Sequence, residues 1–395
     1  MEGTTRMKKK ILILGGGFAG VQAAIELQKK EKYEVTLVSE RDYFFLYPTS
    51  IWIPTRATTF EKTRVPLADI QKKYPFRLII DTVQEIRSSS NTVRCAHRTL
   101  TYDYVIVAVG AEKVLLPGQE HTLSICGKPE MSLAIRDEID RVTQKGSGKI
   151  AIGFSGNPKD TSAVRGGPAF ELIFNIHTLL EKKGIRKNFE LTLFAPMEHP
   201  GIRMGKKALT MIDDMFSRYG IKKRYGKKIK SFYEGGIVFA DDSVLESDFT
   251  MFIPGTSGHH ILAQSDLPLN DAGFVRIDDH MLVEGTTNVY AVGDSAALQG
   301  PDWMTKQGHT AEVMARHAVY NIDMAETGNE SRKGYRSHLA ILCILDTGNG
   351  AAFVYRDERR NIVIPMPIVG HWLKQGWGWY AKLTKLGKVP RVPGL

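Results

Sequence analysis

The chain has 395 residues, of which 43% are hydrophobic and 24% are charged, an ordinary globular composition with length for two domains. Three cysteines are too few for a disulfide framework, and no apolar run approaches the roughly 18 residues of a membrane-spanning helix. The net charge of +10 indicates an anionic partner, and because no zinc or aromatic nucleic-acid module occurs, we expect a membrane surface and no nucleic acid. The alternative is a basic soluble protein without such a partner.

The N-terminal segment carries a strand, turn, helix and strand in order. A buried-strand pattern over 9–14 runs into a glycine turn, Gly15-Gly16-Gly17-Phe18-Ala19-Gly20. Helical spacing over 21–29 and a strand over 34–39, ending at Glu40, come next. This order is the dinucleotide-binding fingerprint, in which Gly15 makes the turn, Gly17 admits a pyrophosphate and Gly20 lets helix and strand pack. Glu40 would hold a ribose diol. A glycine-rich turn in a plain βα unit is the alternative.

Two later segments repeat the pattern of a buried strand that ends in glycine. They cover residues 101–111, with Gly110, and residues 288–294, with Gly293 and Asp294. Together with the first motif they resemble the flavoproteins with two dinucleotide-binding domains, the pyridine nucleotide–disulfide oxidoreductase superfamily. The resemblance implies FAD, with Asp294 on its ribityl chain and Gly110 at the crossing into a second domain. We therefore predict an α/β fold with two Rossmann-like domains, the FAD-binding domain being discontinuous, 1–112 plus 248–330.

The second Rossmann-like domain, 113–247, is predicted to have lost its nicotinamide nucleotide. A strand over 149–153 is followed by Phe-Ser-Gly-Asn-Pro, which lacks the G-x-G-x-x-G glycines, and Glu198 lies beyond the position for a ribose-binding acid. Packing requires less of the sequence than pyrophosphate docking does, so we expect the fold to persist without NAD(P)H binding.

A helix is predicted to start near residues 305–309 and to continue to about residue 321. The superfamily resemblance implies that its N-terminus faces the flavin, where Lys306 would stabilise the reduced, anionic form. A solvated lysine at a helix start is the alternative. The resemblance further implies contacts to FAD from Phe18, Ala19, Arg41, Pro48 and Val83.

The aromatic run at 41–52, which leads through Pro48 into Thr-Ser, resembles the flavin-side loop of the sulfide:quinone oxidoreductases. A Gly-Asp-Ser strand end and a late cysteine extend the likeness over nearly the whole chain, and the absence of C-x-x-x-x-C excludes the disulfide reductases. Flavocytochrome c sulfide dehydrogenase and type II NADH dehydrogenase are similar but more distant. The family uses cysteines near the flavin, and the resemblance assigns that redox role to Cys343, with Cys126 at a position where relatives carry a further cysteine.

Arg165 departs from the family pattern, because the segment Arg165-Gly-Gly-Pro-Ala-Phe-Glu has arginine where the family has a cysteine. Cys126 and Cys343 could act together, Cys343 could act singly with an external sulfur acceptor, or the donor could differ. Arg165 would lower the pKa of a nearby thiol or hold an anion such as hydrosulfide; a surface-loop arginine is the alternative. His199 lies near the family's proton-handling histidine, although a lone loop histidine is usually incidental. Alone, Cys343 among Ile and Leu would be an inert core residue.

The C-terminal region, 331–395, is predicted to carry the redox cysteine and an amphipathic membrane-binding helix over about 371–388. Trp372, Trp379, Leu383 and Leu386 share one helical face, and four lysines at 374, 382, 385 and 388 supply the basic remainder. Gly376 and Gly378 weaken the helix and predict a two-part anchor. Docking on the protein's own core or on a dimer partner is the alternative.

We therefore expect a peripheral flavoprotein on the cytoplasmic face of the cell membrane that carries electrons from sulfide, or related reduced sulfur, through FAD to a quinone. No cleavage site follows the basic N-terminus, which agrees with that location. The alternatives are a type II NADH:quinone oxidoreductase, a sulfide dehydrogenase with another acceptor, or an FAD-binding scaffold. A homo-oligomer is compatible with the sequence.

Overall fold

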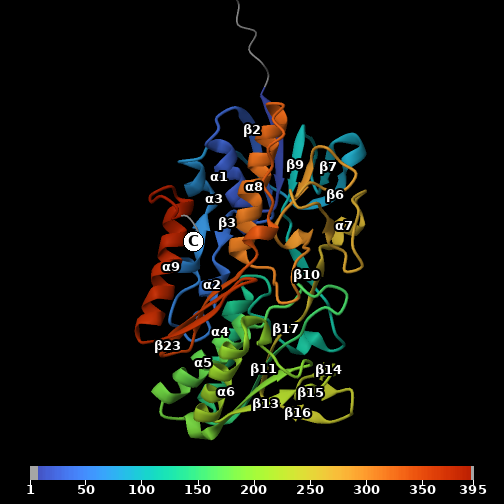
Figure 1. The fold of residues 1–395 in the computed structure, drawn as a ribbon. Coiled ribbons are helices and arrows are strands. Elements are labelled where there is room, and N and C mark those ends of the chain that lie inside the picture. The colour runs from blue at the N-terminus through green and yellow to red at the C-terminus, as the bar shows by residue number, and fades with distance from the viewer. Residues whose placement is uncertain (1–7, 393–395) are drawn as a thin grey trace, which may run out of the picture.

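The glycine motif folds as its spacing predicts: β1 (Lys9–Leu14) leads through the turn into α1 (Phe18–Gln28) and then β2 (Tyr33–Ser39). The computed structural model describes residues 8–392 and has an upper and a lower lobe, with the C-terminal region along one side of both (Figure 1). In the upper lobe a parallel sheet has the order β20-β9-β1-β2-β5. Its other strands are β5 (Arg77–Ile80), β9 (Tyr104–Val107) and β20 (Val289–Ala291).

Helix α8 (Gly308–Glu326) packs on α1 beside this sheet, so segments almost 300 residues apart share one core. Smaller elements complete the upper lobe: β3 (Tyr43–Phe45), α2 (Tyr47–Ser50), β4 (Arg64–Pro66), α3 (Leu67–Gln71), β6 (Val83–Arg87), β7 (Thr92–Cys95), β8 (Thr99–Thr101), α7 (His260–Ala263), β19 (Val275–Arg276) and β21 (Ala296–Ala297). Cys95 ends β7 in a hairpin and is buried, the inert core position expected for it.

The lower lobe is built on a second parallel sheet, of order β13-β12-β11-β17. Its strands are β11 (Gly148–Phe154), β12 (Phe189–Ala195), β13 (Ile221–Tyr225) and β17 (Phe249–Ile253), and its helices are α4 (Met131–Gln144), α5 (Gly167–Lys182) and α6 (Lys206–Tyr219). An antiparallel sheet of β14 (Ile229–Tyr233), β15 (Gly236–Phe239) and β16 (Val244–Glu246) adjoins it. Two Rossmann-type α/β units are thus confirmed.

The domain boundary expected at residue 248 is wrong. The fully buried strand β17 pairs with β11, Phe249 opposite Ile150, and therefore belongs to the lower lobe. The chain crosses between the lobes in two short strands, β10 (Ala111–Lys113) outward and β18 (Thr256–Gly258) on the return, which pair antiparallel. The crossover on the return path therefore lies after residue 253.

The C-terminal region forms an antiparallel sheet of β22 (Ile341–Asp346), β23 (Gly350–Arg356) and β24 (Asn361–Pro367), followed by α9 (Val369–Lys385). The predicted break in this helix is wrong, because α9 runs unbroken and Gly378 packs so closely on α2 that a Cβ would lie 2.7 Å from Thr49 Cγ2. The predicted basic face is also wrong in part, since Lys374 and Lys385 are buried against the protein.

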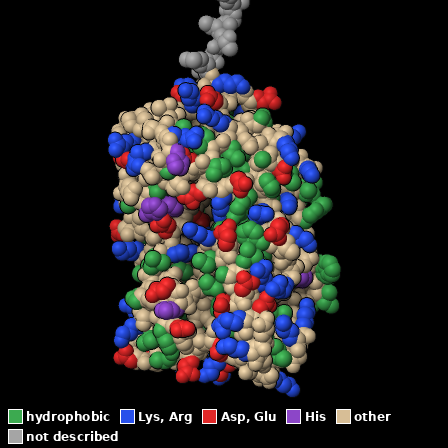
Figure 2. All heavy atoms as spheres, turned by 180° about the vertical axis from the view of Figure 1, so that it is seen from behind, with side chains coloured by type: hydrophobic (Ala, Val, Ile, Leu, Met, Phe, Trp, Pro, Cys, Tyr) green, Lys and Arg blue, Asp and Glu red, His purple; other side chains and the backbone are tan. Residues whose placement is uncertain are grey.

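Trp372 and Trp379 of α9 face outward as predicted, 68% and 67% exposed, whereas Leu386 of the predicted face packs against the core of the upper lobe. Ile368, Val369 and Leu373 are exposed beside them. Seen from behind, hydrophobic side chains protrude at the edge of the molecule where α9 lies (Figure 2). Within residues 8–392 no helix is long and apolar enough to cross a membrane.

Candidate active site

One cavity of about 1420 Å³ has walls from both lobes and from the C-terminal region. With one exception, every residue that the sequence singled out as a site residue lies on its wall. These are Gly15, Gly17, Phe18, Ala19, Glu40, Arg41, Pro48, Val83, Gly110, Cys126, Arg165, His199, Gly293, Asp294, Lys306 and Cys343. The exception, Gly20, is placed beneath the turn and acts through packing.

The three motif glycines differ in what a side chain would meet. A Cβ on Gly20 would lie 1.8 Å from the Gly15 carbonyl oxygen, and Gly15 itself has φ +112 with a Cβ position 2.3 Å from the Ala108 oxygen. A Cβ on Gly17 would meet nothing within 4 Å. Gly15 and Gly20 therefore hold the turn against the sheet, whereas Gly17 leaves open space at the cavity wall for a ligand to approach the backbone.

The start of α1 offers an anion site beside Gly17. No side chain caps this eleven-residue helix, and its first turn carries no acidic residue. Its first backbone N–H groups are therefore available to bind an anion at the cavity wall. Glu40 directly follows β2 and also lines the cavity. The turn, the helix start and the acid stand in the arrangement that an adenine dinucleotide requires.

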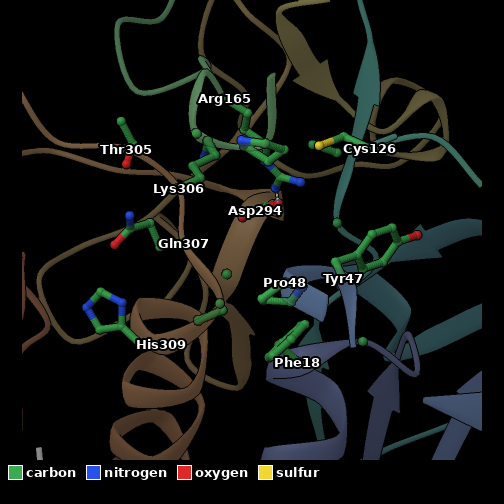
Figure 3. A pocket seen from close by; sticks show the side chains of 18 of the residues that line it. Phe18, Tyr47, Pro48, Cys126, Arg165, Asp294, Thr305, Lys306, Gln307 and His309 are labelled. Carbon is green, nitrogen blue, oxygen red and sulfur yellow. Dashed lines mark ion pairs between the residues drawn. The ribbon is translucent and has the colours of Figure 1, made fainter. Parts of the chain in front are cut away.

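Asp294, at the end of β20, is paired with the guanidinium of Arg165 from the loop after β11 (Figure 3). The expected roles, Asp294 on a ribityl chain and Arg165 as a thiol-activating cation, are thus modified by a contact that links the two lobes. Arg165 is not a peripheral surface arginine, since its side chain is 30% exposed and lines the cavity. The Asp294 carboxylate neutralises part of the positive charge of Arg165.

Lys306 precedes α8 by two residues and is buried, in contrast to a solvated lysine at a helix start. Its Nζ donates a hydrogen bond to the Ala296 carbonyl and lies 3.8 Å from the centre of the Phe274 ring. Burial lowers the pKa of Lys306 to about 7. The ammonium is thus balanced between its charged and neutral forms near neutral pH.

Cys126 and Lys113 lie on the same wall of the cavity as the crossover strand β10. In Figure 3 the Cys126 thiol points toward the side of the cavity where Arg165 lies. The Lys113 Nζ is inaccessible to solvent and has no hydrogen-bond partner among residues 8–392. Burial lowers the pKa of Lys113 to about 8, opposed by the attraction of Cys126. The cationic side chains of Lys113 and Arg165 beside Cys126 suit a small anion.

Cys343 lies on β22 and is a free thiol, as is Cys126. Burial raises the pKa of Cys343 to about 12, and the nearby carboxylate of Glu171 acts in the same direction. The ammonium of Lys374, which pairs with Glu171, acts in the opposite direction. The thiol of Cys343 therefore keeps its proton at neutral pH unless a partner removes it.

The Glu171–Lys374 pair is part of a polar network that fixes α9 to the lower lobe. The Asp346 N–H donates to Glu171 Oε1 at 2.8 Å, and Asp346 accepts hydrogen bonds from Asn175 and His371 at 2.8 Å each. Burial alone would raise the pKa of Asp346, but the His371 bond and the Lys374 charge hold it below its ordinary value. Glu171 shows the opposite balance, because burial raises its pKa despite Lys374.

The C-terminal region also supplies an apolar stretch of the cavity wall. Its residues come from β22, β23 and α9: Ile341, Leu342, Ile344, Phe353, Trp377, Tyr380 and Ala381. Because α9 presents Trp372 and Trp379 outward, one helix carries both cavity-lining and exposed aromatic residues. This wall suits a planar, largely apolar ligand.

Sequence reasoning missed Lys113, Glu171 and Lys374 as site residues. Glu171 ends the segment Arg165-Gly-Gly-Pro-Ala-Phe-Glu, and the likeness of this segment to the family pattern is the signal that could have identified it. The sequence predicts that Lys374 faces the membrane surface, because a lysine on an amphipathic helix is ordinarily solvated. Lys113 has no distinctive pattern around it.

In the lower lobe, the stretch after the first strand differs from the glycine turn of the upper lobe. Between β11 and α5 lies a loop over 155–166, which folds against the cavity. Asn157 in this loop donates to the Thr256 carbonyl at 2.9 Å. In a dinucleotide-binding unit the helix follows the glycine turn directly and points its N-terminus at the pyrophosphate. In this chain the loop over 155–166 separates the strand from the helix instead.

Comparison with known proteins agrees with this architecture. A family model described as "Pyridine nucleotide-disulphide oxidoreductase" matches residues 9–318. A sulfide-quinone reductase of Aquifex aeolicus is 26% identical over 95% of this chain and 90% of its own length. A type II NADH:quinone oxidoreductase of Staphylococcus epidermidis is 23% identical over 88% and 90%. The resemblance to sulfide:quinone oxidoreductases is thereby confirmed.

Solved structures show the same fold. That of the sulfide:quinone oxidoreductase from Aquifex aeolicus matches with a TM-score of 0.86 and 23% identity, covering 96% of this chain and 92% of the other. The NDH2 of Plasmodium falciparum in complex with NADH matches with a TM-score of 0.72 and 14% identity, over 97% and 99%. At these identities the likeness concerns the fold.

Proposed function

As a member of the pyridine nucleotide–disulphide oxidoreductase family the chain is an FAD-dependent oxidoreductase, and we propose that it carries electrons from sulfide to a quinone. The observation that carries this proposal is the composition of one cavity. A free thiol, Cys343, lies beside a buried ion pair, Glu171–Lys374, and both adjoin an apolar wall from the helix whose other side exposes tryptophans.

FAD, when bound, takes two electrons from one partner and gives them to another, so donor and acceptor need not meet. Gly17 and the start of α1 would hold its pyrophosphate, and Glu40 its adenosine ribose. Gly110 and Gly293, both with positive φ, would let the backbone turn closely around it. Arg41, Pro48, Val83 and Lys306 remain proposed contacts, on the strength of their places on the cavity wall.

On the donor side, Cys126, Lys113 and Arg165 would receive hydrosulfide. Cys343 would bond the sulfur of one hydrosulfide as a persulfide while two electrons pass to FAD and one proton is released. A second hydrosulfide would then take that outer sulfur and leave as polysulfide, which restores the thiol. Lys113 would attract the anion, and Arg165, joined to Asp294, would keep the loop of the lower lobe against the end of β20. His199 lines the same cavity from the loop after β12 and is proposed to accept the released proton.

On the acceptor side, the apolar wall of Phe353, Trp377 and Tyr380 would hold the quinone ring. A quinone takes up two protons with its two electrons. The Glu171–Lys374 pair, which also lines the cavity, would pass these protons from water to the quinone one at a time. The exposed face of α9 would rest on the lipid surface that supplies the quinone, on the cytoplasmic side of the cell membrane.

Stopped-flow bleaching of the flavin absorption tests the proposal. Anaerobic sulfide should bleach the flavin rapidly, a soluble quinone should restore it, and NADH should have little effect. Cys343→Ser should slow the bleaching by sulfide by about tenfold or more, equal to about 1.4 kcal/mol of barrier. Cys95→Ser, at a buried position that does not line the cavity, is the matched control and should bleach normally. Fast bleaching by NADH alone would instead establish an NADH:quinone oxidoreductase.

A further inference from the structure

Three side chains with metal-binding atoms converge where the two crossover strands meet. Glu112 is the central residue of β10, and His259 and His260 directly follow β18. One ligand atom from each lies within 4.8 Å of the other two. On the part of the molecule where α7 and β10 lie, histidine side chains appear beside an acidic one in the view from behind (Figure 2).

The three side chains lie close enough together to share one small ligand. Glu112 Oε1 contacts His260 Nδ1 and lies 3.8 Å from His259 Nε2, and the two imidazole rings lie 4.5 Å apart. Glu112 Oε2 accepts the backbone N–H of His260 at 3.0 Å, which fixes the carboxylate in place. The backbone therefore holds the carboxylate where both imidazoles reach it.

We propose that Glu112, His259 and His260 bind one divalent transition-metal ion of the zinc type, which clamps the two crossover strands together. Two imidazoles and one carboxylate are a donor set that zinc accepts, with its remaining position taken by water. Bond lengths of about 2.0 to 2.2 Å place tetrahedral ligand atoms about 3.3 to 3.6 Å apart. The 3.8 Å separation is already near this range, and His260, 59% exposed, is free to turn into it.

The state of His259 fits a ligand. Its Nδ1 is buried and makes no hydrogen bond with any residue in the described part of the chain, while its Nε2 lies 3.8 Å from Glu112 Oε1. The Nε2 atom beside the Glu112 carboxylate is the one that would bind the ion.

The place of the site in the fold gives the ion a structural role. Ala111 pairs with Gly258, and Lys113 with Thr256, so the ion would join the strands at the point where the chain leaves one lobe and returns from the other. Glu112 and His259 also line the cavity. An ion bound here would stabilise the relative position of the lobes and hence the cavity between them.

The test uses the FAD-loaded protein, stripped with a chelator and titrated with Zn²⁺ against a chromophoric competitor. We expect one Zn²⁺ per chain, an upward shift of the thermal unfolding midpoint when Zn²⁺ is added, and at least a tenfold loss of affinity in Glu112→Gln and in His260→Ala. His280→Ala is the matched control, since His280 Nδ1 lies 3.6 Å from the single carboxylate of Asp278, and it should bind Zn²⁺ normally.

Co²⁺ provides a second readout, because its tetrahedral complex absorbs at longer wavelength than the flavin. Binding well below one ion per chain, or affinity unchanged in both variants, would overturn the proposal. A thiolate-to-cobalt charge-transfer band would also overturn it, by placing the ion on a cysteine. If Glu112→Gln loses its fold, His260→Ala still decides the matter, since that exposed side chain is not part of the core.

Discussion

The Lys374 ammonium on α9 and the Glu171 carboxylate on α5 form an ion pair with side chains only 5% and 6% exposed. The pair joins the C-terminal helix to the lower lobe inside the wall of the cavity. Removing one partner leaves an uncompensated buried charge, which costs more than the pair itself contributes.

Lys374→Met should therefore lower the free energy of unfolding by about 3 kcal/mol, measured by chemical denaturation. The double variant Lys374→Met/Glu171→Leu should recover most of that loss, because no buried charge remains. Lys382→Met on the same helix, whose lysine is only partly buried, is the control and should change stability by less than about 0.5 kcal/mol. Equal losses in the single and double variants would show that the pair does not act as a unit.

The motif glycines allow FAD binding to be separated from folding. Gly17→Ala places its methyl group in open space at φ −87, so the apoprotein should unfold at the same denaturant concentration as wild type. FAD affinity should fall by about tenfold or more, since the methyl group occupies the approach to the backbone. Isothermal titration of apoprotein with FAD measures this.

Gly20→Ala is the matched comparison and should behave in the opposite way. Its methyl group would lie 1.8 Å from the Gly15 oxygen, so the fold itself should lose about 2 kcal/mol or more. If both variants lost FAD affinity with unchanged folding stability, the assignment of Gly20 to packing would be incorrect.

The first βαβ unit could be predicted closely because its signals are local. Strand periodicity, three spaced glycines and an acid at a fixed distance define β1, α1 and β2 within a few residues, and the same holds for β20. The boundary at 248 failed because the apolar run over 249–253 fits either parallel sheet. Only pairing with β11 decides, and that pairing is a contact across about 100 residues.

The sequence names residues that line one cavity, but it does not reveal the ion pairs between them. Glycines and cysteines are recognisable by type, whereas the Arg165–Asp294 and Glu171–Lys374 pairs bring together residues more than 100 positions apart. Lys374 illustrates the difficulty, because on a helix with outward tryptophans it fits a headgroup-facing position equally well. Its burial is decided by the carboxylate of α5, which helical periodicity does not reveal.

The raised pKa of Cys343 predicts how its alkylation depends on pH. Because thiolate is the reactive form and burial sets the pKa near 12, the rate should rise about tenfold per pH unit from pH 7 to 9 without levelling. An unperturbed thiol levels near its pKa of about 8.5. The measurement is iodoacetamide labelling of Cys95→Ser/Cys126→Ser in its FAD-loaded form, followed by mass spectrometry. A plateau below pH 9 would show that a cavity group activates the thiol.

The lowered pKa of Lys113 predicts that bleaching by sulfide slows as the pH rises, whereas alkylation of Cys343 becomes faster. The Lys113 pKa is lowered to about 8, so the ammonium that would attract hydrosulfide is lost as the pH rises through 8. Sulfide-dependent bleaching should fall over that range in wild type, and Lys113→Met should be slower at pH 7 and lack that decline. Lys113→Arg keeps its charge at higher pH and should move the decline upward.

A stability measurement separates this role from a structural one. A lowered lysine pKa means that burial of the charged form costs stability below the unfolded pKa of 10.5, with the full cost present below about pH 8. Lys113→Met should therefore be more stable than wild type at pH 7, and the difference should shrink as the pH approaches 10.5. A less stable Lys113→Met would indicate that the ammonium has a partner in the folded protein.

The outward face of α9 predicts binding to lipid vesicles. Trp372 and Trp379 are about two-thirds exposed, and burial of such side chains in a lipid interface contributes about 2 kcal/mol each. Trp372→Ser/Trp379→Ser should lower the affinity for anionic vesicles by about 10²-fold or more in flotation assays, while bleaching by sulfide with a soluble quinone stays intact. Leu115→Ser, an exposed apolar residue outside α9, is the control and should bind vesicles as wild type does. If the double variant keeps its vesicle affinity, this face of α9 covers another protein surface, and a sedimentation experiment should then show the wild type as an oligomer that the double variant no longer forms.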